Sequence, residues 1–228
     1  MRKLKPQRRH ERATSPKGRQ RVTAILHAAR DIFIEEGYHS LTMRKIAARC
    51  GMTVGNLSYY YSNKKHLLHD LLDAVIQGYM ADFDTIMADP SLSPEEQLEA
   101  IVRFIMEDLT TKETTHFFPE LWVLANHDSV AAEGMEYVYA KERAVFVDLI
   151  GRINPALTSE AREVIALFIS ASIEGMTVFV GYKRVWRSCA EETFNIAAKA
   201  FLELVQTAQN DDIAKLPDPK SILSQASR

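Results

Sequence analysis

The sequence contains very little cysteine, and the two cysteines that occur do not form a recognisable site. Cys50 and Cys189 stand far apart and outside any CxxC pair in the 228 residues. This spacing argues against a disulfide framework and against a zinc site, and it favours a reducing cytoplasm. The sequence also has no glycine-rich phosphate loop and no GxSxG nucleophile elbow. We therefore expect no cofactor, no metal and no enzymatic activity.

Long uninterrupted apolar runs are absent as well. The nearest candidate, residues 164–182, is broken by Glu174 and interleaved with Ser and Gly, whereas a membrane span needs roughly 18 to 20 apolar residues in succession. The amino terminus is charged but no apolar segment follows it, unlike a secretory signal. The hydrophobic content of 46% is ample for a buried core. These observations predict a soluble cytoplasmic protein with no membrane partner.

The net charge of -2 conceals a strong asymmetry along the chain. Residues 1–65 carry 15 Lys and Arg against 4 Asp and Glu, a balance of +11, so residues 66–228 must carry -13. A basic end on an otherwise acidic protein is typical of phosphate binding, because each neutralised phosphate releases counterions. The charge distribution therefore predicts a nucleic-acid partner for the amino-terminal part.

Apolar residues recur at helical spacing along most of the chain, and no β pattern of any length occurs. Helix starts are marked by N-capping residues and capping boxes at Thr42, Thr53, Asn63, Ser93, Thr158 and Ser188. We expect an all-α fold of about nine helices with a polar break at 110–115. The expected helices cover residues 19–36, 42–50, 53–60, 63–89, 93–109, 119–127, 130–153, 158–186 and 188–205.

Four segments follow from this pattern. Residues 1–18 form a basic arm that should be disordered in isolation; it could lie along phosphates or enter a minor groove, or it could be only a solubilising tail. Residues 19–66 form a three-helix head, and the long helix after Asn63 links that head to a helical body. The body, residues 67–209, is expected to regulate and to dimerise. Residues 210–228 are expected to be a frayed tail.

Residues 42–67 have the pattern of a helix-turn-helix. Two short helices can pack their apolar faces together, and Gly51 lets the chain turn sharply between them. The outward face is polar, aromatic and basic, which suits a helix that enters a DNA groove. The apolar positions are Ile46, Ala47, Cys50, Met52, Leu57 and Tyr61.

A larger set of positions extends this pattern from residue 20 to residue 67: Ile25-Leu26-His27-Ala28-Ala29, Phe33, Gly37-Tyr38, Thr42, Ile46-Ala47, Gly51, Gly55-Asn56-Leu57-Ser58-Tyr59-Tyr60-Tyr61 and Lys64. In kind and spacing the set resembles the amino-terminal domain of the TetR (tetracycline repressor) family. The resemblance implies an all-helical, homodimeric, ligand-responsive transcription factor, usually a repressor. The remaining 160 residues match that family only in helix count and length. Where the family usually has Leu-Tyr-Tyr-His-Phe, this chain has Leu57-Ser58-Tyr59-Tyr60-Tyr61. Ser58 therefore stands in the place of one of the family's aromatic residues.

Major-groove reading needs side chains that reach base edges and others that fix the register on phosphates. Asn56 can pair with adenine in a bidentate way, Arg44 can pair with guanine, and tyrosine hydroxyls can reach phosphate. Lys64, at the start of the long helix, should add a phosphate contact together with the helix amino terminus. A surface or core role is the alternative for each position. The expected DNA-binding residues are Arg44, Thr53, Gly55, Asn56, Ser58, Tyr59, Tyr60 and Lys64.

Dimerisation follows from the limited reach of one short helix, which reads too few bases for a genomic address. We therefore expect a two-fold dimer on a palindromic operator in double-stranded DNA. The last two helices are the candidates for the interface. Small residues in the stretch 170–176 would permit close helix approach, and Phe194, Phe201 and Leu202 offer apolar anchors. The alternative is that these residues form an intrachain core.

An internal ligand site is also expected, for an unknown small-molecule effector. Bulky aromatic and polar side chains combine on one segment, and further helices could face it, although aromatics at helical spacing also form plain cores. Glu174 is the sharper candidate because an unpaired carboxylate in so apolar a helix is costly; it could meet a cationic ligand, cross the dimer interface, or pair with Arg103 or Arg184. The expected lining residues are His116, Phe117, Trp122, Asn126, Tyr137, Glu174 and Phe179.

The sequence thus favours a sequence-specific DNA-binding regulator, most often a repressor released from its operator by a ligand. One alternative is an architectural protein that binds DNA without sequence preference. Another is a metal-dependent enzyme, because His66 and His69 lie three residues apart on a helix. No third ligand stands at a recognised spacing from those histidines, so the enzyme is the weaker alternative.

Overall fold

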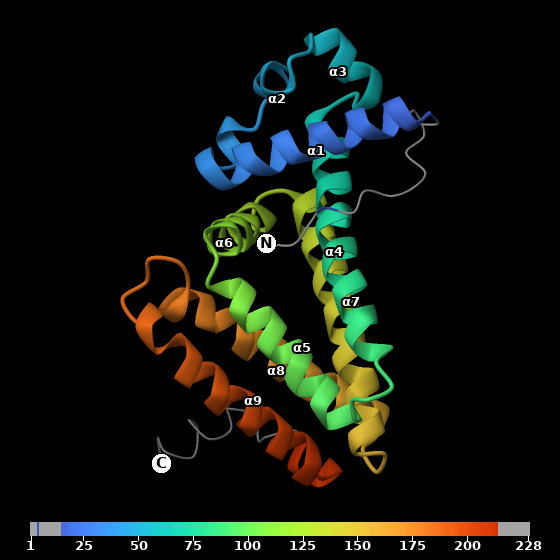
Figure 1. Ribbon diagram of the computed structural model, residues 1–228, viewed down its shortest axis with the longest axis vertical. Coiled ribbons are helices and arrows are strands. Elements are labelled where there is room, and N and C mark those ends of the chain that lie inside the picture. The colour runs from blue at the N-terminus through green and yellow to red at the C-terminus, as the bar shows by residue number, and fades with distance from the viewer. Residues whose placement is uncertain (1–3, 5–14, 214–228) are drawn as a thin grey trace, which may run out of the picture.

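The computed structural model describes residue 4 and residues 15–213, and the regular secondary structure in these residues is entirely helical (Figure 1). Nine α-helices and three short 3-10 turns occur in this part of the chain, so the expected all-α fold is confirmed. The other residues of the basic arm and residues 214–228 of the carboxyl-terminal tail lie outside the described part.

Helix α1 (Pro16–Glu36) forms the base of the head and begins three residues before Arg19, where the sequence pattern placed its start. The reason is an additional cap: the Ser15 hydroxyl accepts a hydrogen bond from the Gly18 amide at 3.0 Å, and Pro16 occupies the first helical position. Gly37 ends the helix with φ at 76°, in a region that favours glycine. The 3-10 turn η1 (Tyr38–Ser40) follows it.

The expected caps of the next three helices are confirmed. The Thr42 hydroxyl accepts from the Lys45 amide at 3.2 Å and begins α2 (Met43–Arg49). Thr53 caps α3 (Val54–Tyr60) in the same way, and the Asn63 side chain caps α4 (Lys64–Met87) by accepting from the His66 amide at 3.0 Å. Gly51, with φ at 62°, makes the turn between α2 and α3. These caps fix the helix-turn-helix directly above α1.

Helix α4 leaves the head and continues along the body, as the course of its ribbon in Figure 1 shows. Its 24 residues correspond to a length of roughly 36 Å. In the body it packs against α7 (Ser129–Ile153), and α7 in turn packs against α8 (Ser159–Val180). Helix α5 (Pro94–Leu109) crosses this layer and packs against α9 (Ala190–Thr207). The head and the body therefore share one continuous helix.

The expected polar break at 110–115 is wrong. Helix α6 (Lys112–Ala125) begins at Lys112 because the Thr111 hydroxyl caps it, accepting from the Thr114 amide at 3.2 Å. Pro119 lies inside this helix and does not begin it. Buried Phe117, Phe118 and Leu121 hold the helix in place despite the backbone hydrogen bond that proline cannot donate.

Three expectations near the carboxyl terminus are also corrected. Helix α8 ends at Val180 and not near Trp186, because the Tyr182 amide donates to the Thr115 hydroxyl at 2.8 Å and turns the chain toward α6. Ser188 lies in the 3-10 turn η2 (Arg187–Cys189), and α9 begins without a side-chain cap. Residues 210–213 are not frayed: they form η3 (Asn210–Ile213), and Asn210 accepts from the Thr158 amide at 2.8 Å.

Candidate DNA-binding surface and internal cavity

Helix α3 presents one face to solvent and buries the other. Leu57 is fully buried, and Tyr61, just after the helix, is 2% exposed. The Tyr61 hydroxyl donates to Asp70 of α4 at 3.1 Å, and burial, with the Asp70 charge, raises the pKa of Tyr61. Tyr59 on the outer face is 58% exposed. The expected contact residues divide accordingly: Arg44, Thr53, Gly55, Asn56 and Tyr59 are exposed, while Ser58, Tyr60 and Lys64 are half-buried.

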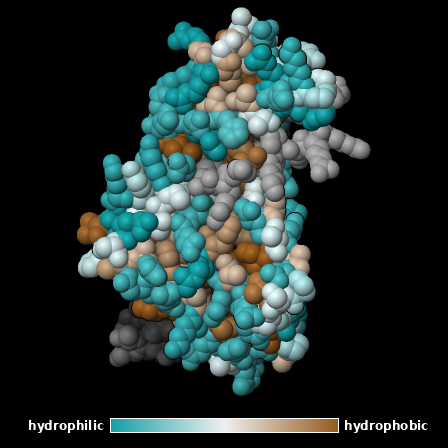
Figure 2. All heavy atoms as spheres, viewed as in Figure 1, coloured by the Kyte–Doolittle hydropathy of each residue, from teal (hydrophilic) through white to brown (hydrophobic). Residues whose placement is uncertain are grey.

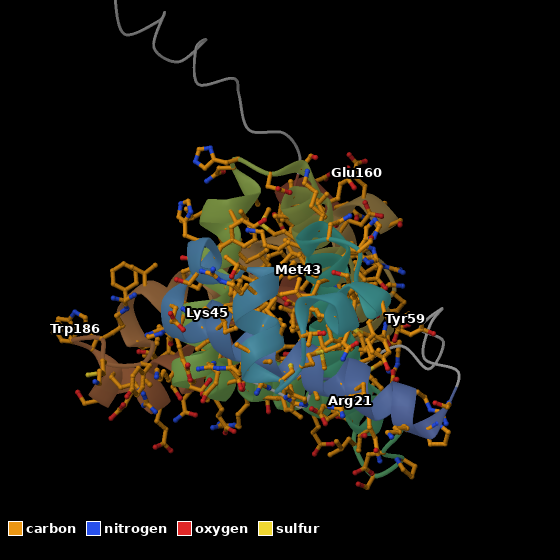
Figure 3. All side chains as sticks on the ribbon, turned by 90° about the horizontal axis from the view of Figure 1, so that it is seen from above. Arg21, Met43, Lys45, Tyr59, Glu160 and Trp186 are labelled. Atoms are coloured by element: carbon orange, nitrogen blue, oxygen red, sulfur yellow. The ribbon has the colours of Figure 1, made fainter. Side chains whose placement is uncertain are left out.

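A groove on the head runs between α1 and α3 and has a volume of about 250 Å³. Asn56, Tyr59 and Tyr60 line it from α3, and Arg21 lines it from α1. Figure 3, which looks down on the head, shows Arg21 and Tyr59 on the same side of the molecule. Arg21 was not among the residues expected from the sequence. Val22, the next residue, is buried. The apolar character of Val22 was the one sign in the sequence that Arg21 points away from the core.

The other basic side chains of the head differ in how they are held. Lys45 is bound to Glu36, and Arg49 donates to Glu35 at 2.7 Å, so both carry a local counter-charge. The Lys64 ammonium lies 3.6 Å from the centroid of the Tyr38 ring. Partial burial lowers the pKa of Lys64, against the opposing effect of the Asp128 charge. Lys64 is therefore packed on the head surface at the start of α4.

Helix α6 joins the head to the body at the end of α1. The Tyr38 amide donates to Glu120 Oε1 at 2.7 Å, and His116 Nδ1 lies 3.2 Å from the Ile34 carbonyl oxygen. The Phe33 and Phe117 rings pack with their centroids 5.0 Å apart. Two residues expected to line a ligand pocket, His116 and Phe117, thus lie at this junction.

An enclosed cavity lies in the body, between α4, α5, α6, α7 and α8. Its volume is about 20 Å³, which is room for about one water-sized group. Tyr79 and Phe83 of α4 contribute to its wall, together with Phe118 of α6, Glu142 of α7 and Glu174 of α8. Helix α4 thus links the recognition head directly to the wall of a cavity.

Glu174 is the one member of the expected lining set that reaches this cavity. Four others lie elsewhere because their helices turn them away from it. Trp122 donates from Nε1 to the Tyr139 hydroxyl at 2.7 Å, and Asn126 is exposed at the end of α6. Tyr137 and Phe179 are 40% and 62% exposed. The expected pairing of Glu174 with Arg103 is not seen, since Arg103 donates to Asn195 at 2.8 Å.

The carboxyl groups around the cavity are held in different ways. Asp108 accepts from Thr114 at 2.7 Å and from the Tyr79 hydroxyl. Glu142 accepts from Ser170 at 2.8 Å, and burial raises its pKa to about 7. Burial, reinforced by the charge of Glu142, raises the pKa of Glu174 well above its usual range. The Glu174 Oε2 atom is buried and has no hydrogen-bond partner among the described residues.

The amino-terminal part of the chain matches a known family. Residues 25–71 match the family described as bacterial regulatory proteins, tetR family. This range runs from the middle of α1 through the whole helix-turn-helix into α4. The head therefore carries the DNA-binding domain of TetR-family regulators.

Curated relatives of this chain are also transcriptional regulators of the helix-turn-helix type. A transcriptional regulator of the helix-turn-helix type from Xanthobacter autotrophicus, encoded in the dhlA 5' region, is 26% identical over 68% of this chain and 76% of its own length. The regulator UidR of Escherichia coli K12 is 38% identical, but over only 22% of this chain and 26% of UidR. The first match thus extends over most of the chain, and the second is stronger but short.

Solved structures of regulators match over most of the chain. A transcriptional regulator from Rhodococcus sp. RHA1 covers 86% of this chain and 99% of its own, with a TM-score of 0.67 and 16% identity. A TetR regulator from Haloarcula marismortui covers 81% and 97%, with a TM-score of 0.63 and 18% identity. The helical body therefore shares the TetR fold although its sequence has diverged.

Two further observations bear on a membrane location and on a metal-dependent activity. Helix α8 is long and apolar enough to cross a membrane by length and composition alone, and only 39% of its most apolar window is buried within the protomer. In the described part of the chain, no group of three or more His, Cys, Asp and Glu side chains could hold a metal ion. His66 lies 3.0 Å from the Ser62 hydroxyl, and His69 lies beside Asp70.

Proposed function

We propose that this protein is a homodimeric repressor that reads a palindromic operator with α3 and is released when a small molecule enters the body cavity. The observation that carries the proposal is the exposed, polar and aromatic face of α3 on the basic head. The opposite face of that helix is packed rigidly on α2 and α4 through Leu57 and Tyr61. A short helix held in this way can enter a major groove without rearrangement.

Within this proposal the residues of the head have separate roles. Asn56 and Arg44 read base edges, while Gly55 lets the backbone approach the DNA closely. The tyrosine hydroxyls and Lys64 bind phosphate and fix the register. Arg21 is added to this group because it lines the same groove as Asn56 and Tyr59. Residues 19–66 then act as the reading domain, and residues 67–209 as the sensing and dimerising domain.

A dimer interface on α8 and α9 is supported by an apolar stripe that one protomer leaves uncovered. Its members recur at helical spacing and are 46% to 62% exposed on α8: Val164, Leu167, Phe168, Val178 and Phe179. Ile196 on α9 is 70% exposed. An exposed apolar surface of this kind marks an interface. The stripe also accounts for the apolar composition of α8 without a membrane.

Two of the residues expected at the dimer interface from the sequence do not belong to this stripe. Phe194 and Phe201 are each 5% exposed and belong to the core of the protomer, as the alternative reading allowed. The Phe201 ring meets Phe168 with centroids 6.3 Å apart. The core aromatic residues therefore support the exposed stripe from beneath, and Phe168, not Phe201, faces the partner.

Release by a ligand is supported by the two routes between cavity and head. Helix α4 carries Tyr79 and Phe83 in the cavity wall and, at its other end, Lys64 against Tyr38 of the head. Helix α6 carries Phe118 in the same wall and Glu120 at the Tyr38 amide. A ligand larger than the present cavity must displace these helices. Displacement changes the distance between the two heads of a dimer, which fixes the fit to successive major grooves.

Selection of bound duplexes from a random DNA library tests the proposal. The expected result is one two-fold symmetric motif, with half-sites separated by about one helical turn of roughly 34 to 36 Å. Reporter expression from a promoter that carries this motif should fall when the protein is supplied. A folded protein that enriches no motif would be an architectural DNA-binding protein, and the proposal would fail.

A further inference from the structure

Two acidic side chains face the cavity with no basic residue opposite them. Glu142 and Glu174 line it from adjacent helices, and among the described residues no Lys, Arg or His lines it. The nearest basic group in electrostatic terms is Arg143, which points toward Glu136 at 3.9 Å on the outside of α7. Such buried carboxyls are costly unless a partner satisfies them. The wall therefore offers two carboxyl groups and no basic group to an entering cation.

Not every hydrogen-bond acceptor in the cavity wall has a donor. The Glu174 carboxyl is hydrogen-bonded to Tyr139 of α7, but its Oε2 atom is buried without a hydrogen-bond partner among the described residues. Glu142 uses Oε1 for Ser170. The neighbouring acid Asp108 is already satisfied by Tyr79 and Thr114. One carboxylate oxygen thus remains without a donor on the α8 side of the cavity, while Asp108 on the α5 side is satisfied internally.

The size and the walls of the cavity define the kind of cation. A volume of about 20 Å³ admits a group of about the size of one water molecule, which a primary ammonium matches and a trimethylammonium exceeds. A primary ammonium also brings three N–H donors. Tyr79, Phe83 and Phe118 supply aromatic surface on the α4 and α6 side, where an apolar substituent and the positive charge are both favoured.

We propose that the cavity binds the protonated primary amine of an alkyl or arylalkyl amine, with the ammonium between Glu142 and Glu174 and the apolar tail against Tyr79, Phe83 and Phe118. This inference rests on the proposed sensing role of the cavity and names the chemical class of its effector. Entry of the tail requires the aromatic wall to open. Because Tyr79 and Phe83 belong to α4, this opening moves the helix that carries the head.

Binding should release protons from the carboxyls. The titratable groups that face Glu174 are Tyr79 of α4, Asp108 of α5, and Tyr139 and Glu142 of α7, while α6 contributes only Thr114 and Phe118. Burial raises the pKa of both Glu142 and Glu174, so an entering cation meets protonated acid near neutral pH. Since the amine stays protonated, its affinity should increase as the pH rises from 6 to 8.

Isothermal titration of the full chain without DNA tests the inference, using straight-chain primary amines from propylamine to decylamine. For the best chain length, the alcohol and the carboxylate of equal length should bind at least tenfold more weakly, and so should the trimethylammonium analogue. Titration in two buffers of different ionisation enthalpy should show proton release with the amine. Equal affinity for the alcohol or the trimethylammonium compound, or no binding by any amine, would overturn the inference.

Matched variants assign the effect to the cavity. Glu174→Gln and Glu142→Gln preserve size and should weaken amine binding at least tenfold and reduce proton release. Glu133→Gln removes an exposed carboxylate from the same helix as Glu142 and should change neither. Circular dichroism melting checks that each variant is folded, and unchanged amine affinity in a folded Glu174→Gln variant contradicts the assignment. Because DNA is absent, failure here leaves the operator selection above as an independent result.

Discussion

The basic residues of the head have distinct surroundings, and these determine what each can do. Lys45 and Arg49 are bound to Glu36 and Glu35 on the α1 side. Arg21 lines the groove beside Asn56 and Tyr59. A basic side chain that lines a groove next to the recognition helix is well placed to meet phosphate, and a contact of that kind carries no base preference.

Replacement of Arg21 by Ala should therefore weaken binding to the selected operator and to random duplex by the same factor. The slope of log affinity against log salt should decrease in magnitude by about one, because one fewer counterion is released. Fluorescence anisotropy over a series of salt concentrations measures both quantities. Arg152→Ala, on the distant surface of α7, serves as the control and should leave the slope unchanged. An unaltered slope in Arg21→Ala would remove Arg21 from the DNA-binding surface.

Glu142 should make stability depend on pH. Burial raises its folded-state pKa from 4.5 to about 7, so between these values the folded state holds more protons than the unfolded state. The free energy of unfolding therefore falls as the pH rises from about 4.5 to 7, by up to about 3 kcal/mol for this group. Glu142→Gln should flatten that decline. Urea titrations of both proteins at pH 5, 6 and 7 measure it, and parallel curves would contradict the burial of an ionisable Glu142.

The two cavity glutamates differ in whether their burial can be recognised from the sequence. Glu174 could be singled out because it interrupts a long apolar segment. Glu142 lies between Lys141 and Arg143, so its surroundings in the sequence are those of an exposed residue. Only the packing of α7 against α4 and α8 places Glu142 inside. Local composition therefore reveals a buried charge only where the neighbouring residues are apolar.

At the scale of elements, the starts of α2, α3 and α4 were predictable because their caps are local. Thr42, Thr53 and Asn63 each bond an amide three residues ahead. The end of α8 was not predictable because it depends on a long-range bond, from the Tyr182 amide to Thr115. The start of α6 was missed because Pro119 is a strong signal of a helix start in a sequence. Here the buried face of α6 tolerates proline within the helix.

The apolar stripe on α8 leads to a prediction about assembly. Leu167→Glu places a charge within an interface of apolar side chains and should weaken the dimer at least tenfold, because burial of an unpaired carboxylate is costly. Size-exclusion chromatography with light scattering over a concentration series should then show monomer where the wild type is dimeric. Val123→Glu is the matched control, since Val123 is also exposed, at 61%, but lies on α6. Equal dimerisation of both variants would place the interface elsewhere.

At the scale of the whole molecule, head and body are connected by α4 and by the α6 junction, as Figure 1 shows for the first of these. Figure 2 shows hydrophilic residues over most of the visible surface, with apolar patches between them. In the loop after α8, Val185 and Trp186 are 90% and 59% exposed. Figure 3 places Trp186 on the opposite side of the molecule from Tyr59. The exposed loop after α8 and the exposed face of α3 thus lie on different sides of the molecule.

The general arrangement was predictable from the sequence, while the cavity was not. Charge asymmetry and the capped short helices placed the DNA-binding function in the head, and helical periodicity gave the helix count of the body. The lining of the cavity depends on how five helices are rotated against one another, which a period of 3.6 residues cannot determine. For this reason Tyr79 and Phe83 were not among the expected lining residues, while Tyr137 and Phe179 were assigned to a pocket that they do not reach.

The central claim is that α3 reads base edges, and the most direct test is to repeat the operator selection with Asn56→Ala. The variant loses one side chain that can pair with a base, while the caps and the buried face of α3 are unchanged. We expect the same two-fold motif to be enriched, with the base preference lost at one position in each half-site. An identical motif, or an equal loss of affinity for specific and random DNA, would contradict base reading by this helix.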